Sequence, residues 1–267
     1  MFYDAHQHLH DSRLAPFLPA LLTELPKLGI AGGIVNGTSG SDWQAVEQLC
    51  AENPWLLPAF GLHPWYVKDR SPNWEQTLTK FLDRNPGASI GEAGLDCWIE
   101  GHDIEDQKSV FIRQLAIARE GNVVITIHCV KAHEPLRQVL QKHPAPARGF
   151  LLHAWGGPAD LTSFLLDRGA HFSFPPYFLH ERKAPRRALF QSLPADRILV
   201  ETDAPDLLPP PGHNPHPLTN PETGQPVNHP ANLLTAYESL AALRDIPLTT
   251  LSTTIASNWN RLFAPQP

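Results

Sequence analysis

Five of the eight predicted strands in this sequence carry a histidine, an aspartate or a glutamate suited to bind metal at or just after their last residue, and these motifs are spread from residue 4 to residue 205. Side chains so far apart in the chain cannot build a local metal finger. They converge only if the strands close into a ring, because the carboxyl ends of parallel strands in a barrel all lie at one mouth. The pattern therefore predicts an enzyme that binds metal ions at the mouth of a barrel.

Short apolar runs alternate with longer amphipathic stretches along the chain. The predicted strands are Phe2–Ala5, Ala31–Asn36, Leu57–Gly61, Ala88–Glu92, Val123–His128, Gly149–His153, His171–Phe174 and Ile198–Glu201. Helices are predicted at Trp43–Glu52, Trp74–Asn85, Gln107–Glu120, Glu134–Lys142, Asp160–Arg168, Lys183–Ser192, Ala231–Leu243 and Leu248–Leu262. Repeated strand–helix alternation predicts a parallel sheet covered by helices. The length of 267 residues is close to the ~250 residues of a TIM-like (β/α)8 barrel, so residues 1–267 are expected to form one α/β domain.

A proline-rich stretch, Ala204–Pro230, interrupts this rhythm after the eighth strand. Long segments without periodic apolar residues are often functional loops, and this one is expected to fold over the barrel mouth. A solvated loop without a function is the alternative.

Composition restricts the class of protein. The chain has no run of eighteen apolar residues and no opening segment typical of a signal peptide, which predicts a soluble, cytoplasmic protein without a membrane partner. Its three cysteines are odd in number and far apart, so reduced thiols are expected. A net charge of −6 argues against a broad basic surface for nucleic acid but leaves room for a local phosphate site. No feature of the sequence calls for an obligate protein partner.

His6 and His8 lie two residues apart, on or just after the first predicted strand. Side chains at i and i+2 point to the same side of a strand, so both imidazoles can bind one ion. Asp4 shares their parity and is expected to support the site from the barrel interior. Glu92 ends an apolar strand, where an unpaired carboxylate would be costly and metal ions would satisfy it.

Two later strands each end in one histidine, His128 and His153. A buried histidine bonded to the backbone is the commoner fate of such a residue, but two on adjacent strand ends favour a shared ion. Asp203 ends the eighth strand, next to the first strand in a closed barrel, and it can bind the ion held by the first strand and take a proton from water. Glu201 has the same parity as Asp203 and is expected to orient a ligand or Asp203 itself.

The predicted ligand set is mixed nitrogen and oxygen without thiolate, which suits Zn, Mn, Fe, Co or Ni and tolerates Mg. With Glu92 as a bridge, two divalent ions ~3.5–4 Å apart are expected. One would be held by His6, His8, Glu92 and Asp203, and the other by Glu92, His128 and His153. Such ions lower the pKa of bound water to roughly 7, and Asp203 would act as the general base that accepts its proton. His63, before Pro64, either contacts the substrate or leaving group or has a capping role.

These residues resemble those of the TatD-type metal-dependent deoxyribonucleases, a branch of the amidohydrolase superfamily. The resembling segments are Asp4-Ala5-His6-Gln7-His8-Leu9, Gly61-Leu62-His63-Pro64, Gly91-Glu92-Ala93-Gly94-Leu95-Asp96, the strands ending at His128 and His153, and Glu201-Thr202-Asp203-Ala204-Pro205. Gln107, Phe111 and Gln114 match the helix that follows the Gly-Leu-Asp turn. The resemblance implies a TIM-like barrel, divalent metals at the six ligands above, Asp203 as the catalytic aspartate, and hydrolysis of phosphodiester bonds in DNA. Asp96, within the third segment, is assigned a supporting role behind the ligands, as is Glu201.

The chain departs from the family pattern at three places. Val130 stands where an arginine is common, His229 replaces the glutamate of an Asn-Glu-Pro motif, and Trp155 lies in the motif after His153. A basic group is expected to compensate by binding phosphate, with the solvated helix face as the alternative. Its members are Lys131, Arg182, Lys183, Arg186 and Arg187.

Three functions remain open from the sequence. The first is a metal-dependent phosphodiesterase or nuclease acting on DNA or another phosphoester. The second is a hydrolase of amide, ester or lactone bonds on the same scaffold, and Glu92 in place of a carboxylated lysine argues against it. The third is a metal-binding protein without catalysis, which would not need Asp203 as a base.

Overall fold

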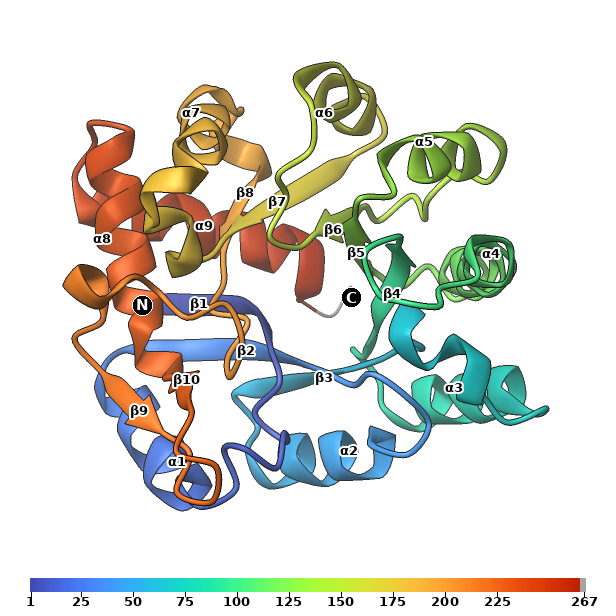
Figure 1. Ribbon diagram of the computed structural model, residues 1–267, viewed down its shortest axis with the longest axis horizontal. Helices are drawn as coiled ribbons and strands as arrows, with labels where there is room; N and C mark the ends of the chain where they lie inside the picture. Colours follow the sequence, from blue (N-terminus) through green and yellow to red (C-terminus); the bar gives the residue numbers. More distant parts are fainter. Residues whose placement is uncertain (265–267) are drawn as a thin grey trace.

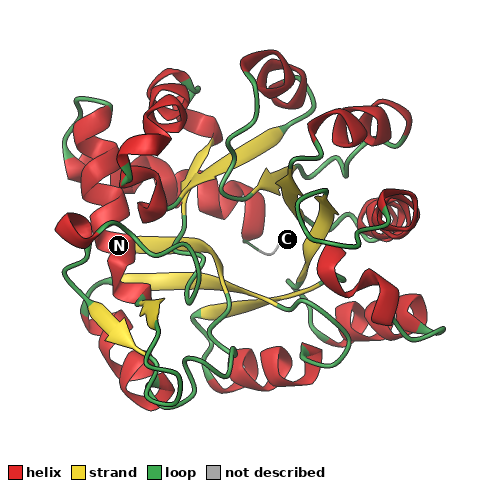
Figure 2. Ribbon diagram, viewed as in Figure 1, coloured by secondary structure: helices red, strands yellow, loops and turns green. Residues whose placement is uncertain are grey.

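The computed structural model describes residues 1–264 and places parallel strands in a ring with helices on the outside (Figures 1 and 2). Within these residues, eight strands follow one another around the sheet in sequence order. They are β1 (Phe2–Gln7), β2 (Ile30–Asn36), β3 (Leu56–Phe60), β4 (Ser89–Asp96), β5 (Ile125–Val130), β6 (Phe150–Leu152), β7 (Ala170–Phe174) and β8 (Ile198–Val200). Every predicted strand is confirmed, and so is the TIM-like barrel.

The helices cover the outer face of this ring. They are α1 (Leu18–Lys27), α2 (Trp43–Glu52), α3 (Trp74–Arg84), α4 (Ile104–Glu120), α5 (His133–Lys142), α6 (Ala159–Leu166), α7 (Ala184–Ser192), α8 (Leu233–Leu243) and α9 (Leu248–Phe263). Amphipathic spacing explains their packing: α3 buries Trp74, Leu78 and Phe81, which lie on one face of the helix. The sequence did not predict α1, because proline residues near its start and inside its last turn mask the helical pattern.

Buried polar side chains complete the barrel between β1 and β8. The carboxylate of Asp4 accepts hydrogen bonds from the backbone N–H of Thr202 at 3.0 Å and from its hydroxyl at 2.6 Å. The backbone N–H of Asp203 donates to the carbonyl of His6 at 2.9 Å just beyond β8. Burial raises the pKa of Asp4 to about 8, although its bonds to Thr202 oppose the shift. Asp4 therefore supports the site by joining the first and last strands, which fixes Asp203 beside His6.

The proline-rich stretch after β8 has two parts. Its first residues, Asp206 to Pro209 together with Pro211, line the cavity at the barrel mouth, as predicted. The later residues form an antiparallel hairpin, β9 (Pro217–Thr219) and β10 (Pro226–Asn228), which lies on the α1 side of the barrel (Figure 1). The hairpin was not predicted, because its strands are only three residues long and each begins with proline.

Among the described residues, no helix is long and apolar enough to span a membrane.

Candidate metal centre

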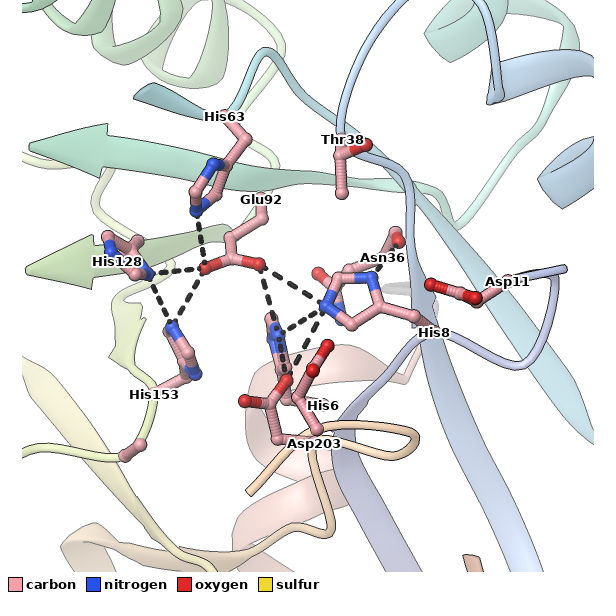
Figure 3. A network of polar contacts seen from close by, with 12 residues as sticks. His6, His8, Asp11, Asn36, Thr38, His63, Glu92, His128, His153 and Asp203 are labelled. Carbon is pink, nitrogen blue, oxygen red and sulfur yellow. Dashed lines mark hydrogen bonds and ion pairs between the residues drawn. The ribbon is translucent and has the colours of Figure 1, made fainter. Parts of the chain in front are cut away.

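Four side chains from three strands meet at one side of the barrel mouth (Figure 3). The Nε2 atom of His6 lies 3.2 Å from Nε2 of His8, 3.3 Å from Oε2 of Glu92 and 3.3 Å from Oδ1 of Asp203. The His8 Nε2 atom lies 3.4 Å and 3.5 Å from the same two oxygens. One imidazole nitrogen carries at most one proton, so the two nitrogens cannot hydrogen bond to all these neighbours.

The other oxygen of Glu92 faces a second set of imidazoles. Its Oε1 atom lies 2.8 Å from Nδ1 of His128, 2.8 Å from Nε2 of His153 and 3.4 Å from Nε2 of His63. The first two nitrogens are 3.1 Å apart. Glu92 is therefore placed between two groups of nitrogen atoms, with one carboxylate oxygen directed at each group (Figure 3).

Hydrogen bonds on the far side of two rings identify their tautomers. His8 Nδ1 lies 2.7 Å from the carbonyl oxygen of Asn36, which can only accept, so Nδ1 carries the proton. His128 Nε2 lies 3.0 Å from Oδ2 of Asp96, and ionised Asp96 likewise requires a proton on that nitrogen. The inward nitrogens of both neutral rings then present lone pairs to Glu92 and its neighbours. Lone pairs facing carboxylate oxygens repel each other unless a proton or a metal cation lies between them.

The pKa values of His8, His128 and Glu92 also indicate that a positive charge is favoured at this centre. Burial by itself lowers the pKa of His8, but the carboxylates of Asp203 and Glu92 outweigh it and hold that pKa well above its usual range. The pKa of His128 is raised in the same way by Asp96 and Glu92, against the effect of burial. Burial alone would raise the pKa of Glu92, yet the surrounding imidazoles keep it well below the ordinary value. A divalent cation replaces such protons when it binds, so the donor set fits metal ions.

The close approach of β4 and β5 brings Glu92 and His128 together. Gly94 has a φ of +142°, and a Cβ atom added there would lie 2.0 Å from the carbonyl oxygen of His128. Only glycine therefore permits this distance between the two strands. Gln107 of α4 then holds both backbone groups of Asp96, with its side chain at 2.8 Å from the N–H and 3.0 Å from the carbonyl.

His63 has the capping role that the sequence offered as one alternative, and contact with a substrate stays a prediction. Its Nδ1 atom accepts a hydrogen bond from the backbone N–H of Trp65 at 3.2 Å, which caps the short 3-10 helix η1 (Pro64–Asp69). Nε2 therefore carries the proton in the neutral ring and points towards Glu92. Burial lowers the pKa of His63 to about 4. The ring is thus a neutral hydrogen-bond donor at the centre.

Glu201 lies behind His153. Its carboxylate accepts hydrogen bonds from the backbone N–H of Ala154 at 2.8 Å and from the hydroxyl of Ser173. Its Oε1 atom is 3.8 Å from Nδ1 of His153, which is too long for a hydrogen bond. Glu201 therefore positions the backbone next to His153.

The centre opens into a cavity of about 900 Å³. Lys131, Arg182, Lys183 and Arg186 are not among its lining residues. Lys131 is exposed just after β5, Arg182 donates to the hydroxyl of Tyr177 at 2.5 Å, and Arg186 packs against Gly156. Phosphate binding by these side chains stays a prediction, and it applies to a substrate that extends beyond the cavity.

The cavity contains groups that the sequence did not single out. Arg13 is the one arginine or lysine among the described residues that line it, and it is paired with Asp11 at 2.7 Å and Asp206 at 2.7 Å. His10 lies 3.4 Å from Asp42, which also lines the cavity. Aromatic side chains contribute as well: the exposed Trp65, Tyr66 and Trp98, and the half-buried Tyr177. Their positions depend on loop geometry, which no local pattern in the sequence reveals.

The three departures from the family pattern have different surroundings. Val130 lines the cavity. Trp155 is buried and its indole N–H donates to the hydroxyl of Thr162 at 2.8 Å. His229 accepts from the backbone N–H of Ala231 at 3.0 Å at the start of a short helix. Only the first of these differences changes the cavity surface, because the other two side chains make structural contacts.

Comparison with known proteins agrees with this geometry. The family model described as "TatD related DNase" matches residues 3–264. The chain is 28% identical over 263 residues to the 3'-5' ssDNA/RNA exonuclease TatD of Erwinia tasmaniensis, covering 98% of this chain and 99% of that protein. It is 26% identical over 264 residues to the uncharacterized metal-dependent hydrolase YjjV of Escherichia coli, covering 98% and 97% of the two chains. The crystal structure of YjjV, described as a TatD homolog, superposes with a TM-score of 0.86 at 25% identity, covering 98% of this chain and 97% of that one. The chain therefore belongs to the family of TatD-related DNases.

Proposed function

We propose that residues 1–267 form one divalent-metal-dependent hydrolase that cleaves phosphodiester bonds in single-stranded nucleic acid. The observation that carries this proposal is the position of Glu92, whose two oxygens face two separate groups of imidazole nitrogens. Two-metal hydrolases of phosphate esters hold two ions ~3.5–4 Å apart, and a carboxylate between two groups of nitrogen ligands suits such a pair. The names of the related exonuclease and metal-dependent hydrolase support the same reaction class. A cytoplasmic location belongs to the proposal and is supported by three free cysteines.

The ligands divide into two sets. One ion would be held by His6, His8, Asp203 and Oε2 of Glu92, and the other by His128, His153 and Oε1 of Glu92. Bound divalent ions would stabilise charge on the phosphoryl oxygens and activate water. The metal itself is not determined by these residues, since nitrogen and oxygen donors suit Zn, Mn, Co, Fe and Ni and tolerate Mg.

The protein's own groups would move the protons. Asp203 lines the cavity and is ionised, because the imidazoles of His6 and His8 lower its pKa against the effect of burial. It is therefore able to accept the proton of the attacking water. His63 presents its Nε2 proton beside Glu92 and is able to donate a hydrogen bond to a phosphoryl oxygen.

A second reaction class is favoured by the charge of the cavity. Apart from Arg13, which is already paired, its charged lining is acidic, with Asp11, Asp42 and Asp206 outside the centre. A small uncharged amide, ester or lactone would enter such a cavity without repulsion. A protein that only binds metal is disfavoured, because Asp203 and His63 both face an open cavity.

The test is incubation of metal-free protein with end-labelled single-stranded DNA, with Mg, Mn, Co or Zn added separately. We expect metal-dependent shortening that Asp203→Asn abolishes. Asp160→Asn is the matched control, since this carboxylate is exposed on α6 away from the cavity. Wild-type activity in Asp203→Asn would contradict the assigned base. Absence of cleavage by metal-loaded wild-type protein, with turnover on a lactone or amide panel, would favour the second class.

A further inference from the structure

Exposed aromatic side chains are concentrated at one place on this protein. Among the described residues, the large hydrophobic side chains that are exposed are Met1, Trp65, Tyr66 and Trp98. The three aromatic residues all line the cavity of the metal centre, with exposed fractions of 41% for Trp65, 41% for Tyr66 and 64% for Trp98. Leaving indole rings in water forgoes the free energy of burial, so a group of them in one cavity indicates a ligand with apolar faces. We name these three residues the aromatic wall.

The aromatic wall is attached to the metal centre through Asp96. The carboxylate of Asp96 accepts the indole N–H of Trp65 at 2.8 Å and the backbone N–H of Trp98 at 2.6 Å. The oxygen that binds the Trp65 indole, Oδ2, also lies 3.0 Å from Nε2 of His128. One carboxylate therefore holds a candidate metal ligand, the indole of Trp65 and the backbone of Trp98. Asp96 is itself buried and held by Gln107, so this support is rigid.

The orientation of Trp65 is also restrained by His63. The two rings meet edge to face, with centroids 5.2 Å apart and an interplanar angle of 85°. The backbone N–H of Trp65 donates to His63, as described above. A side chain held at both its backbone and its indole nitrogen has little rotamer freedom left. Binding of a flat ligand against it therefore costs little conformational entropy.

Charge distinguishes among the flat ligands that could bind there. The cavity offers no unpaired arginine or lysine from its described lining, so it cannot gain much affinity for nucleic acid by neutralising phosphates. Stacking of bases on aromatic side chains contributes to binding without cationic groups. Tyr177 also lines the cavity, and the ammonium of Lys183 lies 4.8 Å from its ring centroid. This contact increases the rigidity of a further aromatic surface.

We propose that the aromatic wall is a nucleobase-stacking subsite that positions a single-stranded end against the metal centre. This inference rests on the proposed function and explains a preference for single-stranded ends. The terminal base is recognised by its π-face, and paired ends are excluded because their bases are already stacked. Recognition by stacking tolerates all four bases. The contribution of this subsite to binding should also depend weakly on salt, because stacking releases few counterions.

The experiment compares substrates with and without a base. Single-stranded thymidine oligonucleotides carry one abasic tetrahydrofuran residue at the 3' end or at the 5' end, and an unmodified oligonucleotide is the reference. Cleavage by metal-loaded wild-type protein is compared with that of Trp98→Ala, Trp98→Phe and Trp55→Phe. Trp55 precedes β3 at the opposite end of the barrel from the cavity and serves as the matched control.

We expect Trp98→Ala to raise KM for the unmodified oligonucleotide about 5- to 150-fold, which corresponds to the ~1–3 kcal/mol of base–aromatic stacking. With wild-type protein, an abasic residue at the processed end should raise KM by a similar factor. Trp98→Ala should not raise KM for this abasic substrate any further. Trp98→Phe should recover most of the loss, and Trp55→Phe should behave as wild type. Equal effects of Trp98→Ala on base-bearing and abasic substrates would overturn the proposal.

A binding measurement separates this proposal from the proposed function. Quenching of tryptophan fluorescence by the unmodified and abasic oligonucleotides is recorded with metal-loaded protein. If no oligonucleotide is cleaved, the proposed function fails, whereas base-dependent binding that Trp98→Ala removes would still support the subsite. Equal affinity for the unmodified and abasic oligonucleotides, or no binding of either, would overturn the proposed subsite whether or not cleavage is observed.

Discussion

Addition of divalent metal to the metal-free protein should raise its melting temperature by an amount that the structure allows us to work out. Two groups of donor atoms converge on the two oxygens of Glu92, so two ions are expected to bind the folded chain. A ligand that binds only the folded state at 100 times its Kd stabilises it by ~2.7 kcal/mol. The unfolded chain does not hold these strand ends together and lacks the preformed site.

The entropy of unfolding converts this free energy into a temperature. At ~2.1 cal/mol/K per residue, the 267 residues correspond to an unfolding entropy of about 0.56 kcal/mol/K. Each ion should therefore raise the melting temperature by about 5 °C, and both together by about 10 °C.

Glu92→Gln should reduce this shift by at least half. The amide retains the shape of the carboxylate but offers one ligand oxygen, so it cannot serve both groups of imidazoles. Differential scanning calorimetry of metal-free and metal-loaded protein measures the shift for each chain. His171→Asn is the matched control, because His171 is a buried histidine at the amino end of β7. An undiminished shift in Glu92→Gln would refute the shared-carboxylate reasoning, and a shift of about 5 °C with one equivalent bound would refute the second ion.

Three further predictions concern the glycine between β4 and β5, the pH dependence of stability and the affinity for metal. Gly94→Ala should lower the free energy of unfolding by about 3 kcal/mol or more in urea titrations, because its Cβ would overlap the carbonyl of His128. Gly101→Ala is the control and should cost only ~1 kcal/mol, because Gly101 has a positive φ but open space around it. Similar losses for both variants would contradict the steric argument. Burial lowers the pKa of His171 from 6.5 to about 4, so the unfolded chain binds its proton in this window and His171 contributes on the order of 3 kcal/mol to a rise in stability from pH 4 to 6.5. Urea titrations should show this rise reduced by that amount in His171→Asn, and an unchanged rise would contradict the assignment. Asp96→Asn should weaken metal binding about 10- to 100-fold in calorimetric titrations, because the amide is a poorer acceptor for Nε2–H of His128, and an unchanged affinity would show that Asp96 does not orient this ligand.

The barrel and the convergence of the six candidate ligands could be predicted from the sequence, because both depend on periodic features. Apolar runs alternating with amphipathic stretches specify parallel strands covered by helices, and parallel strands in a ring necessarily bring their carboxyl ends to one mouth. His6 and His8 share a side because side chains alternate along a strand. The histidines at the ends of β5 and β6 therefore lie together in space although 25 residues separate them in the chain.

Tertiary structure alone decided the electrostatics of the centre. The tautomers of His8 and His128 follow from Asn36 and Asp96, which reach them from other strands. The role of Asp4 in joining β1 to β8 depends on the register at the closure of the ring, and its sequence neighbourhood does not reveal it.

The candidate ligands could be predicted from the periodicity of the sequence, whereas the other side chains that line the cavity could not. Apolar runs marked Glu92 and Asp203 as candidate ligands before any fold was known, although β4 continues past Glu92 to Asp96 and β8 ends three residues before Asp203. Trp65 lies in η1 after β3 and Trp98 directly follows β4, and the basic side chains after β5 and β7 do not line the cavity. Loop conformation depends on contacts with distant segments, such as Gln107 to Asp96 and Arg13 to Asp206, and such contacts exist only once the barrel has closed.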